Sequence, residues 1–202
     1  MLLKSAGITD VVINTHHLAD RIKDRLGDGE KFGVSLHYAY EPTLGGIAAG
    51  LKRAHRVIGN EPFVVMNDCV IADLDLADVL AYHEEQGADA TLVLRPAHGV
   101  RHHGPLDYDA EVPLSALIGE APDEAGFLSP SGIRVFGPRI FDFIPEGSTR
   151  SLADTLALMV QSGCHIEGYV MDGYWGELNT WERYAHILWQ VGRGFVPEPP
   201  ES

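Results

Sequence analysis

The sequence predicts an α/β fold built around a mixed, mainly parallel sheet. Segments with the pattern of buried strands alternate with amphipathic helical segments, which is the order of βαβ units. The clearest strand is the apolar run Phe63 to Met66, whose length and unbroken apolar character are typical of a strand buried on both faces. Asn67, Asp68 and Cys69 follow it directly. Ligands of open α/β sheets bind beyond the carboxyl ends of the strands, so this polar cluster is the first candidate site.

The other elements follow in chain order. Residues 1–6 have the pattern of the end of a helix, which Gly7 closes. Ser151 is a suitable N-cap for a later helix. The expected strands are 8–14, 34–40, 63–67, 90–95, 114–119, 131–136 and 165–171, and the expected helices are 17–26, 44–58, 75–86, 151–161 and 180–191.

The composition is that of one globular domain with an acidic surface. The chain has 202 residues, of which 45% are hydrophobic and 22% charged, so it can bury one sizeable core. Its formal net charge of −14 argues against a nucleic-acid or anionic-membrane partner, because such surfaces need clustered Lys and Arg. Two cysteines are too few for a disulfide framework, and no apolar run approaches the roughly 18 residues of a membrane span. We therefore expect a cytoplasmic protein.

Five segments in order resemble one family of enzymes. They are AGITDVVINTHHLADRIKDRLGDG, EPTLGGIAAGLKRA, PFVVMNDCVIADLDL, SGIRVFGPRIFDFIP and GYWGELNTWERY. Across residues 2–188 they resemble the sugar-1-phosphate nucleotidyltransferases, also called NDP-sugar pyrophosphorylases. The VINTHHLAD run is similar to the group of mannose-1-phosphate guanylyltransferases and N-acetylmuramate-1-phosphate uridylyltransferases. The resemblance implies a Rossmann-like, GT-A-type three-layer sandwich.

The resemblance also implies a shortened domain. In the family, a first strand and a glycine-rich phosphate loop precede the helix that here ends at Ala6. We therefore expect residues 1–192 to form an N-terminally truncated nucleotidyltransferase-like domain, and residues 193–202 to be a disordered tail. A reading frame that begins late and a genuinely shortened relative both remain open.

The family pattern assigns several positions to nucleotide or sugar binding. Glu41, Gly45 and Gly46 match a segment that runs beside the nucleotide base, where glycine lets the backbone approach a ligand closely. A glycine-containing helix start without a ligand is the alternative. The positions that the resemblance implies are Glu41, Gly45, Gly46, Asn67, Asp68, Gly104 and Glu120.

The resemblance places a magnesium site at Asp68 and Glu177. The triplet from Asn67 to Cys69 matches the family's Asn-Gly-Asp, so Cys69 stands at the position of the metal-binding aspartate. A thiol is a poor ligand for magnesium, which binds hard oxygen donors, and we expect Cys69 to be a buried cysteine without a ligand role. Glu177 keeps a carboxylate at the second metal position.

Two functions remain open at this point. The family joins a nucleoside triphosphate to a sugar 1-phosphate, which releases pyrophosphate and gives an NDP-sugar. A catalytically impaired relative that binds a nucleotide sugar, or that partners an active subunit, is the alternative, and the missing phosphate loop and the substitution at Cys69 favour it. Both predict nucleotide or nucleotide-sugar ligands, and the apolar surface that a missing first strand would expose favours a homo-oligomer.

Overall fold

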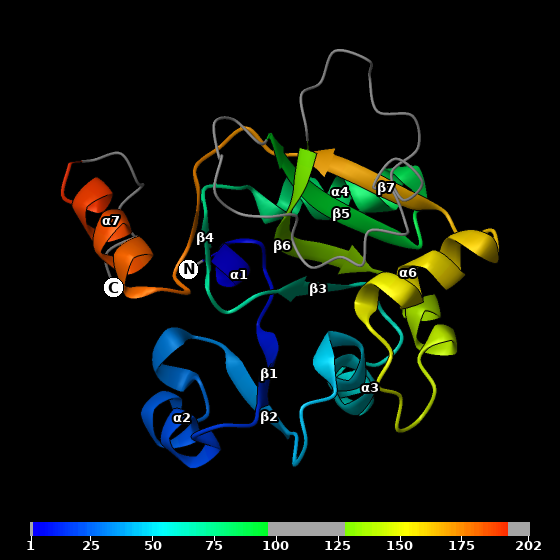
Figure 1. Ribbon diagram of the computed structural model, residues 1–202, viewed down its shortest axis with the longest axis horizontal. Coiled ribbons are helices and arrows are strands. Elements are labelled where there is room, and N and C mark those ends of the chain that lie inside the picture. The colour runs from blue at the N-terminus through cyan, green and yellow to red at the C-terminus, as the bar shows by residue number, and fades with distance from the viewer. Residues whose placement is uncertain (1, 97–127, 194–202) are drawn as a thin grey trace.

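The computed structural model describes residues 2–96 and 128–193 (Figure 1). Gly104, Glu120, the expected strand 114–119 and the expected tail beyond residue 193 lie outside the described residues. The strands of the described part form three hydrogen-bonded groups. Helices pack on both faces of the largest group, which gives the three-layer arrangement that the resemblance implied.

The largest group is a four-stranded sheet in the order β3-β6-β5-β7. Its strands are β3 (Phe63–Met66), β5 (Ala90–Pro96), β6 (Leu128–Phe136) and β7 (Ile166–Val170). Strand β6 runs antiparallel to both of its neighbours, whereas β5 and β7 are parallel. The prediction of an α/β fold with a mixed sheet is confirmed, although antiparallel pairing has a larger share than we expected.

The two faces of this sheet carry separate cores. Along β5, Leu92 and Leu94 pack into one core, and Val93 between them packs into the other, as the two-residue period of a strand requires. The first core includes Leu156 of helix α6 (Leu152–Gln161), and the second includes Val79 of helix α4 (Leu76–Gln86). The interleaved burial of β5 explains why its sequence reads as an unbroken apolar run.

A second group is the parallel pair of β1 (Asp10–Thr15) and β2 (Ser35–Tyr40), which is paired from Asp10 with Ser35 to Thr15 with Tyr40. No strand of the described part pairs with the other edge of β1 or with the outer edge of β3. All four residues of β3 are only half buried, in contrast to the fully buried centre of β5. The β1–β2 pair is therefore a block separate from the main sheet (Figure 1).

A third group pairs β4 (Val70–Ala72) with β8 (Trp175–Glu177) in the antiparallel sense, so that Val70 lies opposite Glu177. We did not predict either strand, because a three-residue strand has too few positions to show a period. This short pair carries the residues that close the candidate site.

The remaining elements agree with the predicted helices to within a few residues. Asp75, Ser151 and Thr180 each cap a helix by accepting a hydrogen bond from the backbone of its first turn, so the N-cap predicted at Ser151 is confirmed. No helix in the described residues is long and apolar enough to cross a membrane. The other elements are α1 (Leu2–Ser5), α2 (Ala19–Leu26), α3 (Gly46–Ile58), α7 (Trp181–Val191) and the 3₁₀ helices η1 (Glu30–Phe32) and η2 (Pro138–Phe143).

Candidate functional site

The first cluster of polar side chains lies where β3 ends and where β4 meets β8. The backbone N–H of Leu178 donates to the carbonyl of Cys69 at 2.7 Å, which joins the end of β8 to the residue before β4. Asn67 lies against β6, where its Oδ1 accepts from Nη1 of the buried Arg134 at 3.3 Å. Two segments about a hundred residues apart thus meet at the carboxyl end of β3, as the family motifs predicted.

Glu177 is the central carboxylate of this cluster. Its Oε2 accepts from Arg183 Nη1 at 2.5 Å, and the Cys69 thiol lies 3.7 Å from its Oε1. The same Nη1 of Arg183 donates to Asn179 Oδ1 at 2.7 Å. Arg183 is in the first turn of α7, where its backbone N–H donates to the capping hydroxyl of Thr180. The cap and the ion pair together place this guanidinium beside Glu177.

Cys69 is only partly buried, not fully buried as we expected, and its surroundings favour the neutral thiol over the thiolate. Burial raises the pKa of the Cys69 thiol, and the carboxylates of Glu177 and Asp68 raise it further because they repel a second negative charge. The thiol is also positioned to donate to Glu177, which stabilises the protonated form. Cys69 therefore acts as a weak hydrogen-bond donor within this cluster.

We expect the reactivity of Cys69 to report on Glu177. In a Cys164→Ala background, alkylation of Cys69 by iodoacetamide should reach its half-maximal rate at a higher pH than that of an ordinary cysteine. Glu177→Gln should shift this profile to lower pH, because a neutral amide no longer opposes the thiolate, although burial still raises the pKa. The control is Glu182→Gln, which removes an exposed carboxylate from the first turn of α7, the turn that also carries Arg183. This variant should leave the pH profile of Cys69 alkylation unchanged. A profile that does not move in Glu177→Gln would contradict this arrangement.

The donors in this cluster do not fit a magnesium ion. Both oxygens of Glu177 already face protein donors, and Cys69 offers a neutral thiol where a hard oxygen ligand is required. Asp68, the other implied ligand, is exposed. In residues 2–96 and 128–193, no three His, Cys, Asp or Glu side chains are arranged to hold a metal. The magnesium site implied at Asp68 and Glu177 therefore lacks a matching set of ligands.

A second cluster surrounds Glu41 at the carboxyl end of β2. Glu41 is 1% exposed, and its Oε1 accepts from Asn14 Nδ2 at 3.1 Å. Its Oε2 lies 3.4 Å from the backbone N–H of Gly45, and its carbonyl accepts from His16 Nδ1 at 2.7 Å. The Glu41 carboxylate therefore connects the end of β1 to the start of α3.

The glycines at the start of α3 have two different roles. A Cβ on Gly45 would lie 2.5 Å from the Cβ of Ala49, so packing of the helix requires glycine there. Gly46 has φ +77°, in the left-handed region that glycine tolerates, and the space around it is open. The backbone at Gly46 is therefore accessible, as the proposed approach of a ligand requires.

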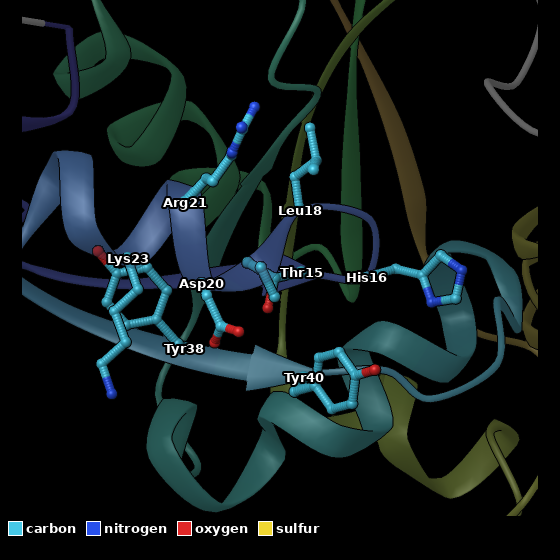
Figure 2. A pocket seen from close by; sticks show the side chains of 9 residues that line it. Thr15, His16, Leu18, Asp20, Arg21, Lys23, Tyr38 and Tyr40 are labelled. Atoms are coloured by element: carbon cyan, nitrogen blue, oxygen red, sulfur yellow. The ribbon is translucent and has the colours of Figure 1, made fainter.

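A hollow of about 570 Å³ lies next to the Glu41 cluster, between the carboxyl ends of β1 and β2 and helix α2 (Figure 2). Thr15, Asp20 and Tyr40 border it, and Tyr40 is 57% exposed. Leu18 lies on its rim and is half exposed with φ 55°, which is uncommon for a bulky residue. An exposed aromatic ring beside polar groups is suited to a planar or ring-shaped ligand.

The structure brings the implied residues together in two clusters. Asn67, Asp68 and Glu177 belong to the first, and the segment from Glu41 to Gly46 belongs to the second. Two arginines near Glu177 were not among the residues expected from the sequence. Arg95 ends the apolar run of β5, so the strand-end rule that identified Asn67 would also have identified it. Arg183 follows Glu177 by six residues and had no such signal.

Comparison with known proteins identifies the family. The model of the family described as nucleotidyl transferase matches residues 1–192. The chain belongs to this family. A mannose-1-phosphate guanylyltransferase of Mycobacterium tuberculosis is 28% identical to this chain, and the match covers 98% of this chain and 55% of the relative. An N-acetylmuramate alpha-1-phosphate uridylyltransferase of Neisseria meningitidis is 33% identical over 88% of the chain and 76% of the relative.

Solved structures share the nucleotidyl transferase fold. A putative glucose-1-phosphate thymidylyltransferase from Bacillus anthracis, in complex with sucrose, has a TM-score of 0.73 at 21% identity and covers 98% of this chain and 81% of its own. HddC from Yersinia pseudotuberculosis, complexed with GMP-PN, has a TM-score of 0.72 at 18% identity, and the match covers 94% of this chain and 82% of HddC. The chain spans about half the length of several curated relatives that it matches, including a UTP–glucose-1-phosphate uridylyltransferase of Synechocystis.

Proposed function

We propose that this protein transfers a nucleotidyl group from a nucleoside triphosphate to a sugar 1-phosphate. An oxygen of the sugar phosphate attacks the α-phosphorus, the bond from that phosphorus to the bridging oxygen breaks, and pyrophosphate leaves with the bonding electrons. The observation that carries the proposal is the meeting of the Asn67–Cys69 segment with Glu177 at the carboxyl end of β3. The names of two relatives, a mannose-1-phosphate guanylyltransferase and an N-acetylmuramate alpha-1-phosphate uridylyltransferase, support it.

The two clusters suggest how a nucleotide would lie. The base and ribose would occupy the hollow beside Glu41, where Tyr40 offers a ring face and Gly46 an accessible backbone. The phosphates would extend toward Asn67 and Glu177, where Arg134 and Arg183 supply positive charge. Gly104 and Glu120 remain proposed sugar contacts by resemblance. Magnesium enters this proposal as the counter-ion of the triphosphate substrate, and the proposed setting is the cytoplasm, with a homo-oligomer as the assembly to test.

Pyrophosphate release tests this proposal. The full chain would be incubated with each nucleoside triphosphate and with mannose, glucose or N-acetylmuramate 1-phosphate, in the presence of magnesium. We expect release with at least one pair of substrates, and a fall of about tenfold or more in Glu177→Gln, which loses the carboxylate that positions Arg183. A folded chain that releases no pyrophosphate with any pair would overturn the proposal.

Binding of a nucleotide sugar without turnover is the second candidate. The pairing of Glu177 with Arg183, instead of an arrangement open to a metal, favours it. Calorimetric titration with GDP-mannose and UDP-glucose separates the two candidates, because binding without pyrophosphate release supports the second one alone.

A further inference from the structure

A guanidinium group lies where the resemblance implies a metal ion. Glu177 and Arg183 form an ion pair at 2.5 Å, and their side chains are 19% and 24% exposed. Charges that are largely withdrawn from solvent are screened less by salt than exposed ones. A cation that approached Oε2 of Glu177 would meet the positive charge of Arg183, which Glu177 and Asn179 both hold in place. The positive charge at this position is therefore built into the chain.

A second guanidinium lies near the same carboxylate. Arg95 stacks on the indole of Trp175, with its central carbon 3.8 Å from the ring centroid. Trp175 and Glu177 are two residues apart in β8 and therefore face the same side of this strand, so the ring that holds Arg95 lies next to Glu177. Burial lowers the pKa of Arg95, and the negative charge of Glu177 opposes this shift. The two arginines come from different elements, β5 and α7, and Glu177 of β8 pairs with Arg183.

The scaffold holds Arg95 in a fixed orientation. The indole N–H of Trp175 donates to the carbonyl of Ser131 at 2.7 Å, and Trp175 lies in β8 opposite Ala72. Within the described residues, Nε of Arg95 is buried and has no hydrogen-bond partner. A buried N–H group without a partner costs free energy, so an acceptor supplied by a ligand would be stabilised there.

These observations point to an anion with several oxygens. Guanidinium groups are planar and donate in a fork that matches phosphate oxygens, and each carries five N–H groups, so one that contacts a carboxylate can also contact a phosphate. The nearby acidic groups are Glu177, which pairs with Arg183, and the exposed Asp68. The chain is strongly acidic, which makes two partly buried arginines near one carboxylate distinctive.

We propose that Arg95 and Arg183 bind the diphosphate group of a nucleotide or nucleotide sugar and take the place of a divalent metal. Glu177 is then a positioning residue for Arg183 and not a metal ligand. The inference rests on the proposed function for the class of ligand, but it concerns binding and does not require turnover.

Calorimetric titration of the full chain with inorganic pyrophosphate in EDTA tests this inference. We expect saturable binding, and a loss of affinity of about tenfold or more in Arg183→Gln, the size expected for a hydrogen bond to a charged group. Arg193→Gln removes an exposed guanidinium just after the same helix and should bind as the unmodified chain does. Absence of pyrophosphate binding in EDTA, or unchanged affinity in a folded Arg183→Gln variant, would overturn the proposal.

A direct metal titration provides the second arm. Free Mn²⁺, followed by electron paramagnetic resonance, should not be taken up by the unmodified chain, whereas Cys69→Asp combined with Arg183→Gln should take it up. Uptake by the unmodified chain that Glu177→Gln abolishes would overturn the proposal. Pyrophosphate binding in EDTA without any turnover would leave the inference standing and reject the proposed enzyme function. Turnover that requires a metal and is unchanged in Arg183→Gln would support the proposed enzyme function and reject the inference about the two arginines.

Discussion

Gly173→Ala should lower the free energy of unfolding by about 3 kcal/mol, the upper end of the range for overpacking a close contact. A Cβ on Gly173 would lie 2.0 Å from the backbone carbonyl oxygen of Asp73 and 3.0 Å from its carbonyl carbon. Backbone cannot rotate away as a flexible side chain can, so β4 and β8 would have to separate. Their separation would break the hydrogen bond from Asp73 N–H to the carbonyl of Tyr174.

Urea unfolding followed by circular dichroism measures this loss. Gly192→Ala is the matched control, because Gly192 has an ordinary helical φ of −62° and a Cβ there would have its nearest neighbour at 3.5 Å. The control should change stability by about 0.5 kcal/mol or less. Since β8 carries Glu177, Gly173→Ala should also weaken pyrophosphate binding. Equal stabilities of the two variants would show that β4 and β8 do not approach each other as described.

Glu41→Ala should destabilise the protein by about 2–4 kcal/mol. The substitution leaves Asn14 Nδ2 and the Gly45 N–H without their acceptors in a buried corner and also opens a cavity. Glu41→Gln keeps the volume and one acceptor oxygen, so its cost should be smaller, about 1–2 kcal/mol.

The same urea titrations compare these variants. Glu61→Ala removes an exposed carboxylate and should stay within about 0.5 kcal/mol of the unmodified chain. If Glu41→Ala were no more costly than Glu61→Ala, the carboxylate of Glu41 would not hold the start of α3. If Glu41→Gln were as costly as Glu41→Ala, the charge of Glu41 would matter more than its shape.

Much of the scaffold follows from local patterns in the sequence. Long amphipathic helices and the apolar runs that became β3 and β5 were predicted because their periods extend over many residues. The antiparallel orientation of β6 was not predicted. The direction of a strand relative to its neighbours depends on which strands it pairs with and not on its own residues. Strands β4 and β8 were missed because each has three residues and exists only through pairing with the other.

The candidate site shows the same division. Asn67 and Asp68 were predictable because they follow a strand directly, and Glu177 because it lies in a family motif. The Glu177–Arg183 ion pair was not predictable, because it depends on the angle at which α7 leaves β8. The family resemblance implied a metal site at two carboxylates, Asp68 and Glu177, whereas in the structure the guanidinium of Arg183 pairs with Glu177.

In the described residues, no strand pairing joins the β1–β2 pair to the other strands. Glu41 directly follows β2, whereas Glu177 lies in β8, so no backbone ladder connects the two clusters. Helix α3 packs on β1 and β2 and also reaches η2, where His55 stacks on Phe141 at 3.8 Å and Lys52 Nζ donates to the carbonyl of Phe141. The span available to a ligand that contacts both clusters is therefore set by side-chain packing, which yields more readily than a hydrogen-bonded sheet.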